Sequence, residues 1–88
     1  MKWWTVLLAY VLITVKSGSE REFLKGIAKF DEITEANLVI GENDIVIKID
    51  VDDVAEMDRF LTEKLRVLPE VFLTTTMIIT EQIKPAPQ

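Results

Sequence analysis

The stretch TVLLAYVLITVK, residues 5–16, is apolar at consecutive positions, so neither of its two alternating sets of side chains is polar. Val6, Val11, Ile13 and Val15 within it are β-branched, which favours a pleated strand over a helix. A strand with apolar side chains on both faces is typical of a sheet centre, where both faces are covered. We therefore predict a central strand here, buried on both faces.

The sequence around this strand superficially resembles a signal peptide, because Lys2 precedes the apolar run and Lys16-Ser17-Gly18-Ser19 follows it. However, a membrane-spanning helix needs about 20 apolar residues. No small-residue cleavage site of the Ala-x-Ala type ends the run either. We interpret the run as a strand, and we expect a cytoplasmic protein with no membrane partner.

A helix is predicted directly after this strand. Ser19 and Glu22 have the Ser-x-x-Glu spacing of a capping box, in which the two side chains satisfy free amides at a helix start. Apolar residues then recur at three- and four-residue steps and form one stripe: Phe23, Leu24, Ile27, Ala28 and Phe30. The pattern predicts a helix that packs through one face.

A hairpin is predicted next. Residues 33–40 read as a strand with alternating faces, and residues 45–51 as a strand whose odd-numbered positions are all apolar. Between them, Gly-Glu-Asn-Asp at residues 41–44 has the composition of a turn.

A second helix and a last strand complete the chain. Asp53 and Glu56 repeat the capping-box spacing, and Pro69 ends the helix because proline has no amide to donate. The apolar stripe of this helix comprises Val54, Met57, Leu61 and Leu65. Residues 71–80 then read as a strand that is rich in threonine at even positions. The predicted order of elements is βαββαβ.

This order predicts an α+β, ferredoxin-like fold: a four-stranded antiparallel sheet with two helices on one face. The 88 residues suffice for one domain, which we place at residues 1–80, with a flexible C-terminal tail at residues 81–88. Because the central strand is apolar on both sides, we predict that the protein dimerises through the other sheet face. Trp3 and Trp4 are predicted to contact a neighbouring subunit.

Composition excludes several classes of function. The formal charge is −5, from 15 acidic and 10 basic residues, and this sign opposes binding to nucleic-acid phosphates. The chain has no Cys and no His, which removes thiolate and imidazole metal ligands and the Ser-His and Cys-His catalytic pairs. We therefore expect no cofactor, no metal and no direct contact with nucleic acid.

Several local strings together resemble a known family. They are AYVLI at residues 9–13, GENDI at 41–45, VDD at 51–53, LPEV at 68–71, and Thr74-x-Thr76 in the last strand. In this order and at these distances they are similar to the ligand-binding domain of the leucine-responsive regulatory protein/AsnC family, the feast/famine regulators. The resemblance covers nearly the whole chain. Members usually carry an N-terminal helix-turn-helix domain, whereas here the first strand begins within the first few residues, as in the stand-alone members.

The resemblance also implies a ligand site. Family members that bind amino acids hold the ligand between dimers, against the hairpin turn and the last strand, and the neighbouring dimer contributes the rest of the pocket. The residues carried over are Gly41, Glu42, Asn43, Asp44, Thr74 and Thr76. Amides and hydroxyls suit a ligand carboxylate, and acidic oxygens suit an ammonium group. The family commonly has an aromatic residue where Asn43 stands, which bears on the identity of the ligand. A purely structural interpretation, as turn residues and strand formers, remains open for all six.

The leading hypothesis is a non-catalytic module that senses an amino acid or another small effector and assembles in transcriptional regulation. It implies a homodimer, which could form a larger ring such as an octamer, and a possible hetero-oligomer with a helix-turn-helix-bearing relative. Two alternatives stay open. One is a purely structural oligomerisation domain. The other is a small dimeric ferredoxin-like enzyme, such as a cofactor-free monooxygenase or an acyl-phosphate hydrolase, although without His or Cys no acid–base pair is evident.

Overall fold

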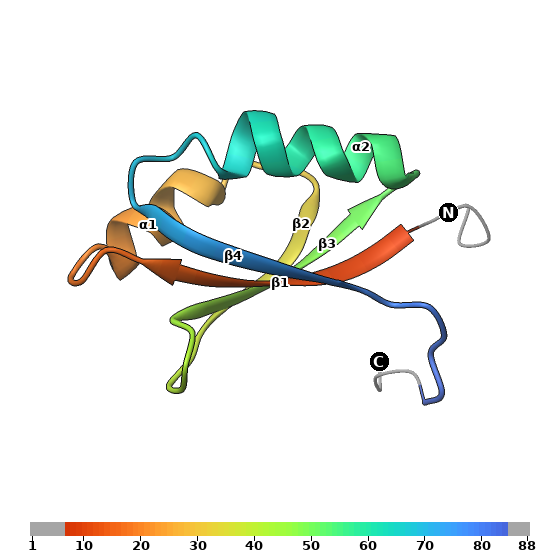
Figure 1. Cartoon of the computed structure of the whole chain (residues 1–88), viewed down its shortest axis with the longest axis horizontal. Coiled ribbons are helices and arrows are strands. Elements are labelled where there is room, and N and C mark those ends of the chain that lie inside the picture. Colours follow the sequence, from red (N-terminus) through yellow and green to blue (C-terminus); the bar gives the residue numbers. More distant parts are fainter. Residues whose placement is uncertain (1–6, 85–88) are drawn as a thin grey trace.

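The computed structural model describes residues 7–84 and contains the predicted order of elements (Figure 1). The elements are β1 (Leu7–Val15), α1 (Glu20–Ile27), β2 (Ile33–Leu38), β3 (Ile45–Val51), α2 (Val54–Arg59), the π-helical segment η1 (Phe60–Leu65) and β4 (Val71–Ile78). Trp3 and Trp4, the predicted start of the first strand and the last four residues of the predicted tail lie outside the described residues. Among residues 7–84, no helix is long and apolar enough to cross a membrane.

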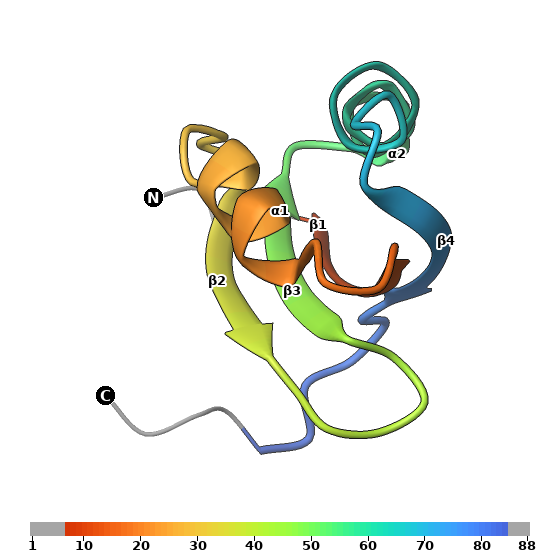
Figure 2. The ribbon, with the colours of Figure 1, turned by 90° about the vertical axis from the view of Figure 1, so that its left-hand side faces the viewer.

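The four strands form one antiparallel sheet in the order β2-β3-β1-β4. β1 therefore lies inside the sheet and pairs with β3 on one side and with β4 on the other, as its two apolar faces predict. Both helices lie on the same side of the sheet (Figures 1 and 2). The predicted ferredoxin-like α+β fold is thus confirmed.

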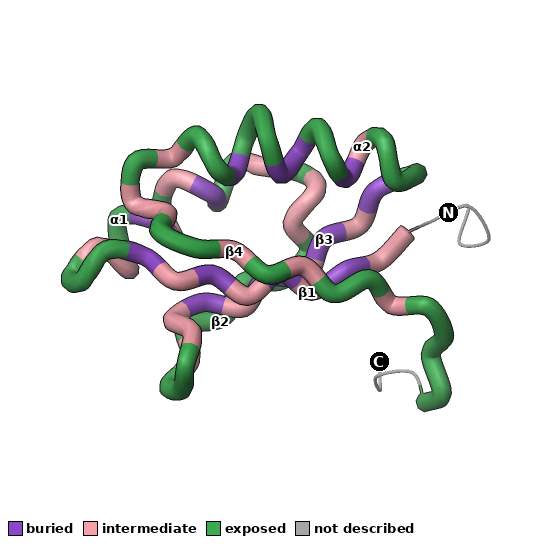
Figure 3. Tube along the Cα trace, viewed as in Figure 1, coloured by how far each residue is buried: buried purple, intermediate pink, exposed green. Residues whose placement is uncertain are grey.

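The core fills the space between the sheet and the helices (Figure 3). The sheet contributes the odd-numbered side chains of its two inner strands: Ala9, Val11, Ile13, Val15, Ile45, Ile47, Ile49 and Val51. The helical side contributes Phe23, Ile27, Met57, Phe60, Leu61 and Leu65. Phe60 was absent from the predicted stripe, but it is fully buried, and its ring meets that of Phe30 edge to face at 5.9 Å. Val54, by contrast, belonged to that stripe and is exposed.

The two predicted capping boxes have different outcomes. The Asp53 carboxylate accepts a 2.8 Å bond from the Glu56 amide and caps α2, while Glu56 accepts from the Asp52 amide. α1 does begin after Ser19, but the Ser19 side chain makes no capping bond, so the box predicted there is wrong. The physical reason is the Ser19 backbone, whose φ of −97° and ψ of 4° depart from the extended conformation that aims a cap side chain at the helix amides.

Some element boundaries also differ from the prediction. β2 ends at Leu38 and β4 at Ile78, both two residues short of the predicted ends. The predicted second helix continues past Arg59 as η1, where the Arg66 amide donates to the Leu61 carbonyl five residues back. The apolar stripe alone cannot separate this wider turn from an α-helical one, because it buries Leu61 and Leu65 in either case.

The second sheet face is covered by no helix or strand within residues 7–84, as predicted. We call it the open face, and its side chains, which follow from the strand register, are Leu8, Tyr10, Leu12 and Thr14 of β1, Glu35 and Asn37 of β2, Val46, Lys48 and Asp50 of β3, and Leu73, Thr75 and Met77 of β4. Leu73 and Met77 expose 60% and 50% of their surface. The face is apolar along β1 and β4 and polar along β2.

Candidate functional site

The connection between β2 and β3 is held against the end of β1. The Asp44 amide donates to the Ile13 carbonyl at 3.0 Å, and the Val15 amide donates to the Asp44 carboxylate at the same distance. The Asn43 side-chain amide donates to the Thr14 hydroxyl at 3.2 Å. Two of the candidate ligand residues, Asn43 and Asp44, are therefore already fixed by bonds within the chain.

The outer part of the same connection is exposed. Gly41 and Glu42 lie on the surface, and no atom comes within 4 Å of the position that a Cβ at Gly41 would occupy. Among residues 7–84 only Gly18 has a positive φ, so the backbone of this turn does not itself require glycine at position 41. Gly41 and Glu42 are thus free to meet another molecule.

Thr74 and Thr76 lie on β4, on the sheet face that the helices cover. Their register partners on β1 are Ile13 and Val11, which belong to the core. The Arg66 side chain donates to the Thr74 hydroxyl at 3.3 Å. The Thr76 hydroxyl is buried, and among the described residues it has no hydrogen-bond partner. Both hydroxyls therefore face the helical layer of this chain.

The two groups of candidate residues do not meet within one chain. Asn43 and Asp44 contact β1 from the β3 side, whereas Thr74 and Thr76 flank β1 from the β4 side. β1 itself lies between them. A single copy thus offers two separate groups of polar atoms.

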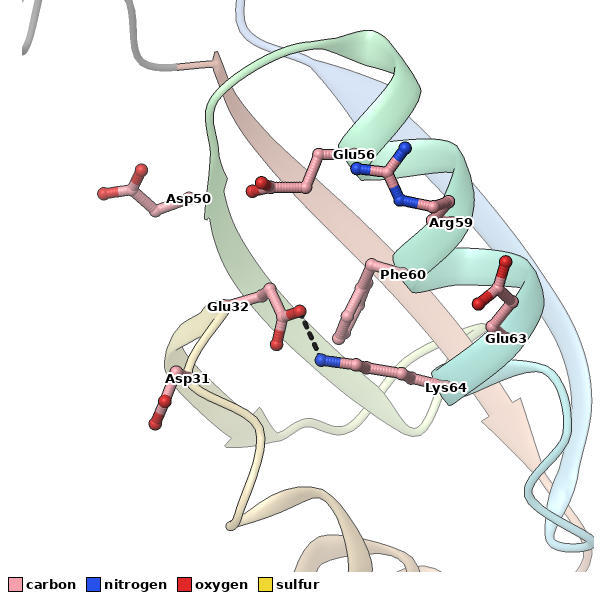
Figure 4. Close-up of a pocket in the computed structure, with 8 residues that line it drawn as sticks. All are labelled: Asp31, Glu32, Asp50, Glu56, Arg59, Phe60, Glu63 and Lys64. Atoms are coloured by element: carbon pink, nitrogen blue, oxygen red, sulfur yellow. Dashed lines mark hydrogen bonds and ion pairs between the residues drawn. The ribbon is translucent and has the colours of Figure 1, made fainter.

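A cavity of about 440 Å³, which the sequence interpretation missed, opens between the α1–β2 connection and the α2–η1 helix (Figure 4). Its lining is Asp31, Glu32, Asp50, Glu56, Arg59, Phe60, Glu63 and Lys64. The Lys64 ammonium bonds the Glu32 carboxylate at 2.6 Å. The Asp50 side chain points away from those of α2 and η1 (Figure 4). No sequence motif marks this cavity, because its charges come from segments far apart in the chain.

The pKa of Glu32 is lowered from its ordinary value. Burial of the carboxylate by itself would raise the pKa, but the hydrogen bond and the positive charge of Lys64, together with a backbone hydrogen bond, outweigh it. The lining has five carboxylates, of which Asp50 points away, against two cations, and this excess of negative charge makes the cavity attractive to cationic groups. Within residues 7–84, however, no three acidic side chains are grouped as metal ligands would be.

Comparisons with known proteins find relatives that match most of this chain. Residues 8–88 match the Lrp/AsnC ligand binding domain. The structure of FFRP-DM1 is similar, with a TM-score of 0.80 and 37% identity, and the match covers 83% of this chain and 97% of that one.

Two curated regulators are similar at the sequence level. The HTH-type transcriptional regulator FL11 of Pyrococcus horikoshii is 35% identical over 78 residues, which are 89% of this chain and 51% of that protein. The leucine-responsive regulatory protein of Escherichia coli K12 is also 35% identical, over 89% of this chain and 49% of that protein. The chain thus spans about half the length of these regulators. It belongs to the Lrp/AsnC ligand-binding domain family, a non-enzymatic family of domains associated with transcriptional regulators.

Proposed function

We propose that this chain is a sensing and assembly module that dimerises through the open face and binds a free amino acid between dimers. The ligand would contact Gly41, Glu42, Asn43, Asp44, Thr74 and Thr76. Domains of this family oligomerise, which supports the assembly part of the proposal. The effector, the dimer contact and the regulatory partner are our inference.

The observation that carries the proposal is the division of the candidate residues into two groups with β1 between them. One group offers a turn with exposed backbone at Gly41 and a carboxylate at Glu42. The other offers the hydroxyl of Thr74, held by Arg66. A zwitterion needs donors for its carboxylate and anionic oxygens for its ammonium group. Two copies could supply both from different chains, which makes assembly and ligand binding mutually dependent.

The exposed apolar side chains of β1 and β4 support the dimer contact. Leu73 and Met77 are at least half exposed on the open face, beside Tyr10 and Leu12. Contiguous apolar surface of this kind marks interaction sites on soluble proteins. A twofold copy buries the same side chains on both partners at once.

The regulatory step would occur by mixed assembly in the cytoplasm. With a charge of −5, the chain is poorly suited to bind DNA directly. It would instead join a helix-turn-helix-bearing relative and alter that relative's assembly. Mixing the purified chain with such a relative should give oligomers that contain both proteins in native mass spectrometry. Only unmixed oligomers would contradict this step.

Thermal unfolding in the presence of each of the twenty amino acids tests the sensing function. Leucine comes first, because one similar regulator is named as leucine-responsive. A ligand at about 100 times its dissociation constant adds about 2.7 kcal/mol, which raises the Tm of a small domain by several degrees. We expect such a rise with one amino acid or a few related ones.

Two threonine variants make the test specific. Thr74→Val removes a candidate ligand hydroxyl and should abolish the rise in Tm. Thr62→Val is the matched control, because the Thr62 hydroxyl bonds the Asp58 carbonyl on the exposed helix surface, and it should keep the rise. If no amino acid at millimolar concentration raises the Tm, the chain is not an amino-acid sensor.

A further inference from the structure

We infer that Lys48 and Glu35 are the residues by which one copy of this chain recognises another, pairing reciprocally across the open face. This inference rests on the proposed dimer and names its specificity determinant. It follows from how the charged side chains of this face are arranged.

Lys48 belongs to a row of side chains that crosses the open face. The strand register places Glu35 of β2, Lys48 of β3, Tyr10 of β1 and Met77 of β4 side by side. The Lys48 ammonium lies 5.7 Å from the centre of the Tyr10 ring, a cation–π distance, and its side chain is half-buried. The ammonium is therefore held over an inner strand, in the middle of the face.

Lys48 has no carboxylate partner among the described residues. Glu35 lies opposite Lys48 in the register, but its carboxylate accepts a 2.9 Å bond from the Asn37 side chain instead. The ion pairs within residues 7–84 are Lys25–Glu22 and Lys64–Glu32, and neither lies on the open face. Both charges of the row are thus available to a partner.

Covering the open face removes water from Lys48. A desolvated ammonium group without an anion is costly, so a covering surface that brings a carboxylate to Lys48 is favoured. A second copy does this, because the same face carries Glu35. We place Lys48 of each copy against Glu35 of the other, and under twofold symmetry this contact occurs twice. The face carries both signs of charge, Lys48 together with the carboxylates of Glu35 and Asp50, so it can complement a second copy, whereas a uniformly acidic partner would repel the two carboxylates.

Charge reversal tests the pairing. Lys48→Glu and Glu35→Lys each place like charges opposite one another in the homodimer. Each variant should raise the dimer dissociation constant about tenfold or more, as measured by analytical ultracentrifugation. An equimolar mixture of the two variants restores opposite charges at both pairs and should form heterodimers with near wild-type affinity. Lys25→Glu is the matched control, since Lys25 is exposed on α1, and it should dimerise like wild type.

The outcomes separate the pairing from the dimer itself. Heterodimers from the mixture support the pairing, because only contacts between chains can rescue one variant with the other. If the double variant dimerises like wild type while the mixture of the two single variants does not, Lys48 and Glu35 act within one chain. That result would overturn the pairing between copies. Single variants with wild-type affinity would also overturn it and leave the proposed dimer intact. A monomeric wild type would contradict the dimer.

Discussion

At the scale of single residues, two glycines have different reasons to be glycine. Gly18 has a φ of 83°, a conformation that other residues adopt only with strain. Gly41 has no such φ, and a Cβ added there would have no neighbouring atom within 4 Å. The fold of one chain therefore requires glycine at position 18 but not at position 41. If Gly41 matters, it matters through another molecule.

The substitutions Gly41→Ala and Gly18→Ala should consequently behave in opposite ways. We expect Gly41→Ala to leave the free energy of unfolding unchanged, or to raise it by up to about 1 kcal/mol by restricting the unfolded chain, while it reduces the rise in Tm caused by the effector. Gly18→Ala should cost about 1 kcal/mol and keep the effector response. Urea unfolding and thermal unfolding measure the two effects. Equal destabilisation by both variants would show that the turn itself needs Gly41.

At the scale of elements, α1 and α2 begin with the same spacing of capping-box residues, but only α2 has a side-chain cap. Asp53 caps α2 through the Glu56 amide, and its backbone is extended, with φ of −157° and ψ of 177°. Ser19 has the same spacing to Glu22, yet its side chain makes no capping bond. A sequence pattern gives the residues of a cap, whereas the incoming chain direction decides whether the bond forms. Here that direction is set by the turn from Lys16 to Ser19.

Alanine substitutions at these two positions should separate the helix starts. Asp53→Ala should lower the free energy of unfolding by about 1 kcal/mol, because the capped amide loses its acceptor. Ser19→Ala should change it by less than about 0.5 kcal/mol, the range of surface substitutions that touch no special contact. Urea unfolding of both variants at one protein concentration checks this. A loss at Ser19 equal to that at Asp53 would contradict the geometry at the start of α1.

The Glu32–Lys64 ion pair joins the α1–β2 connection to η1 and should make stability depend on pH. Because the pKa of Glu32 is lowered in the fold, its charged form stabilises the fold above the ordinary pKa of 4.5, and this contribution disappears as pH falls through the lowered value. Glu32→Gln should therefore lower the Tm at neutral pH, and the difference from wild type should shrink towards about pH 3. Thermal unfolding across that range measures the difference.

A second glutamate provides the control for this pH dependence. Glu22 pairs with Lys25 at 3.9 Å, and both side chains are about three-quarters exposed. Such pairs contribute little to stability. Glu22→Gln should leave the Tm almost unchanged at either pH. A difference at Glu32 that stays constant with pH would mean that the pair with Lys64 does not stabilise the fold.

The strands and the core could be predicted because a strand that buries one face has apolar residues at every second position. The apolar odd positions of β3 follow from contact with the helices on one face, and the continuous apolar run of β1 follows from its inner position in the sheet. Strand ends, the π-helical turn of η1 and the burial of Phe60 were not predictable. They depend on the Arg66 to Leu61 bond and on packing against Phe30, which no local pattern records.

At the scale of the whole molecule, the chain has two layers, helices and sheet, and the open face leaves the inner strand β1 half-exposed on one side. The six candidate ligand residues were carried over from a family resemblance, and their position relative to one another depends on strand order. Sequence could place them at a turn and on a strand, but not on opposite sides of β1. The acidic cavity beside Lys64 was missed for the same reason, since distant segments form it.

The molar mass of the purified chain in solution, measured by light scattering at tens of micromolar, tests most directly whether the open face joins two copies. One chain has a mass of 10.1 kDa. We expect at least twice this value for wild type, and a lower mass for Met77→Lys, which places a charge among the apolar side chains of the open face. A wild-type mass of 10.1 kDa would contradict assembly through this face, and with it the proposed sensing site between dimers.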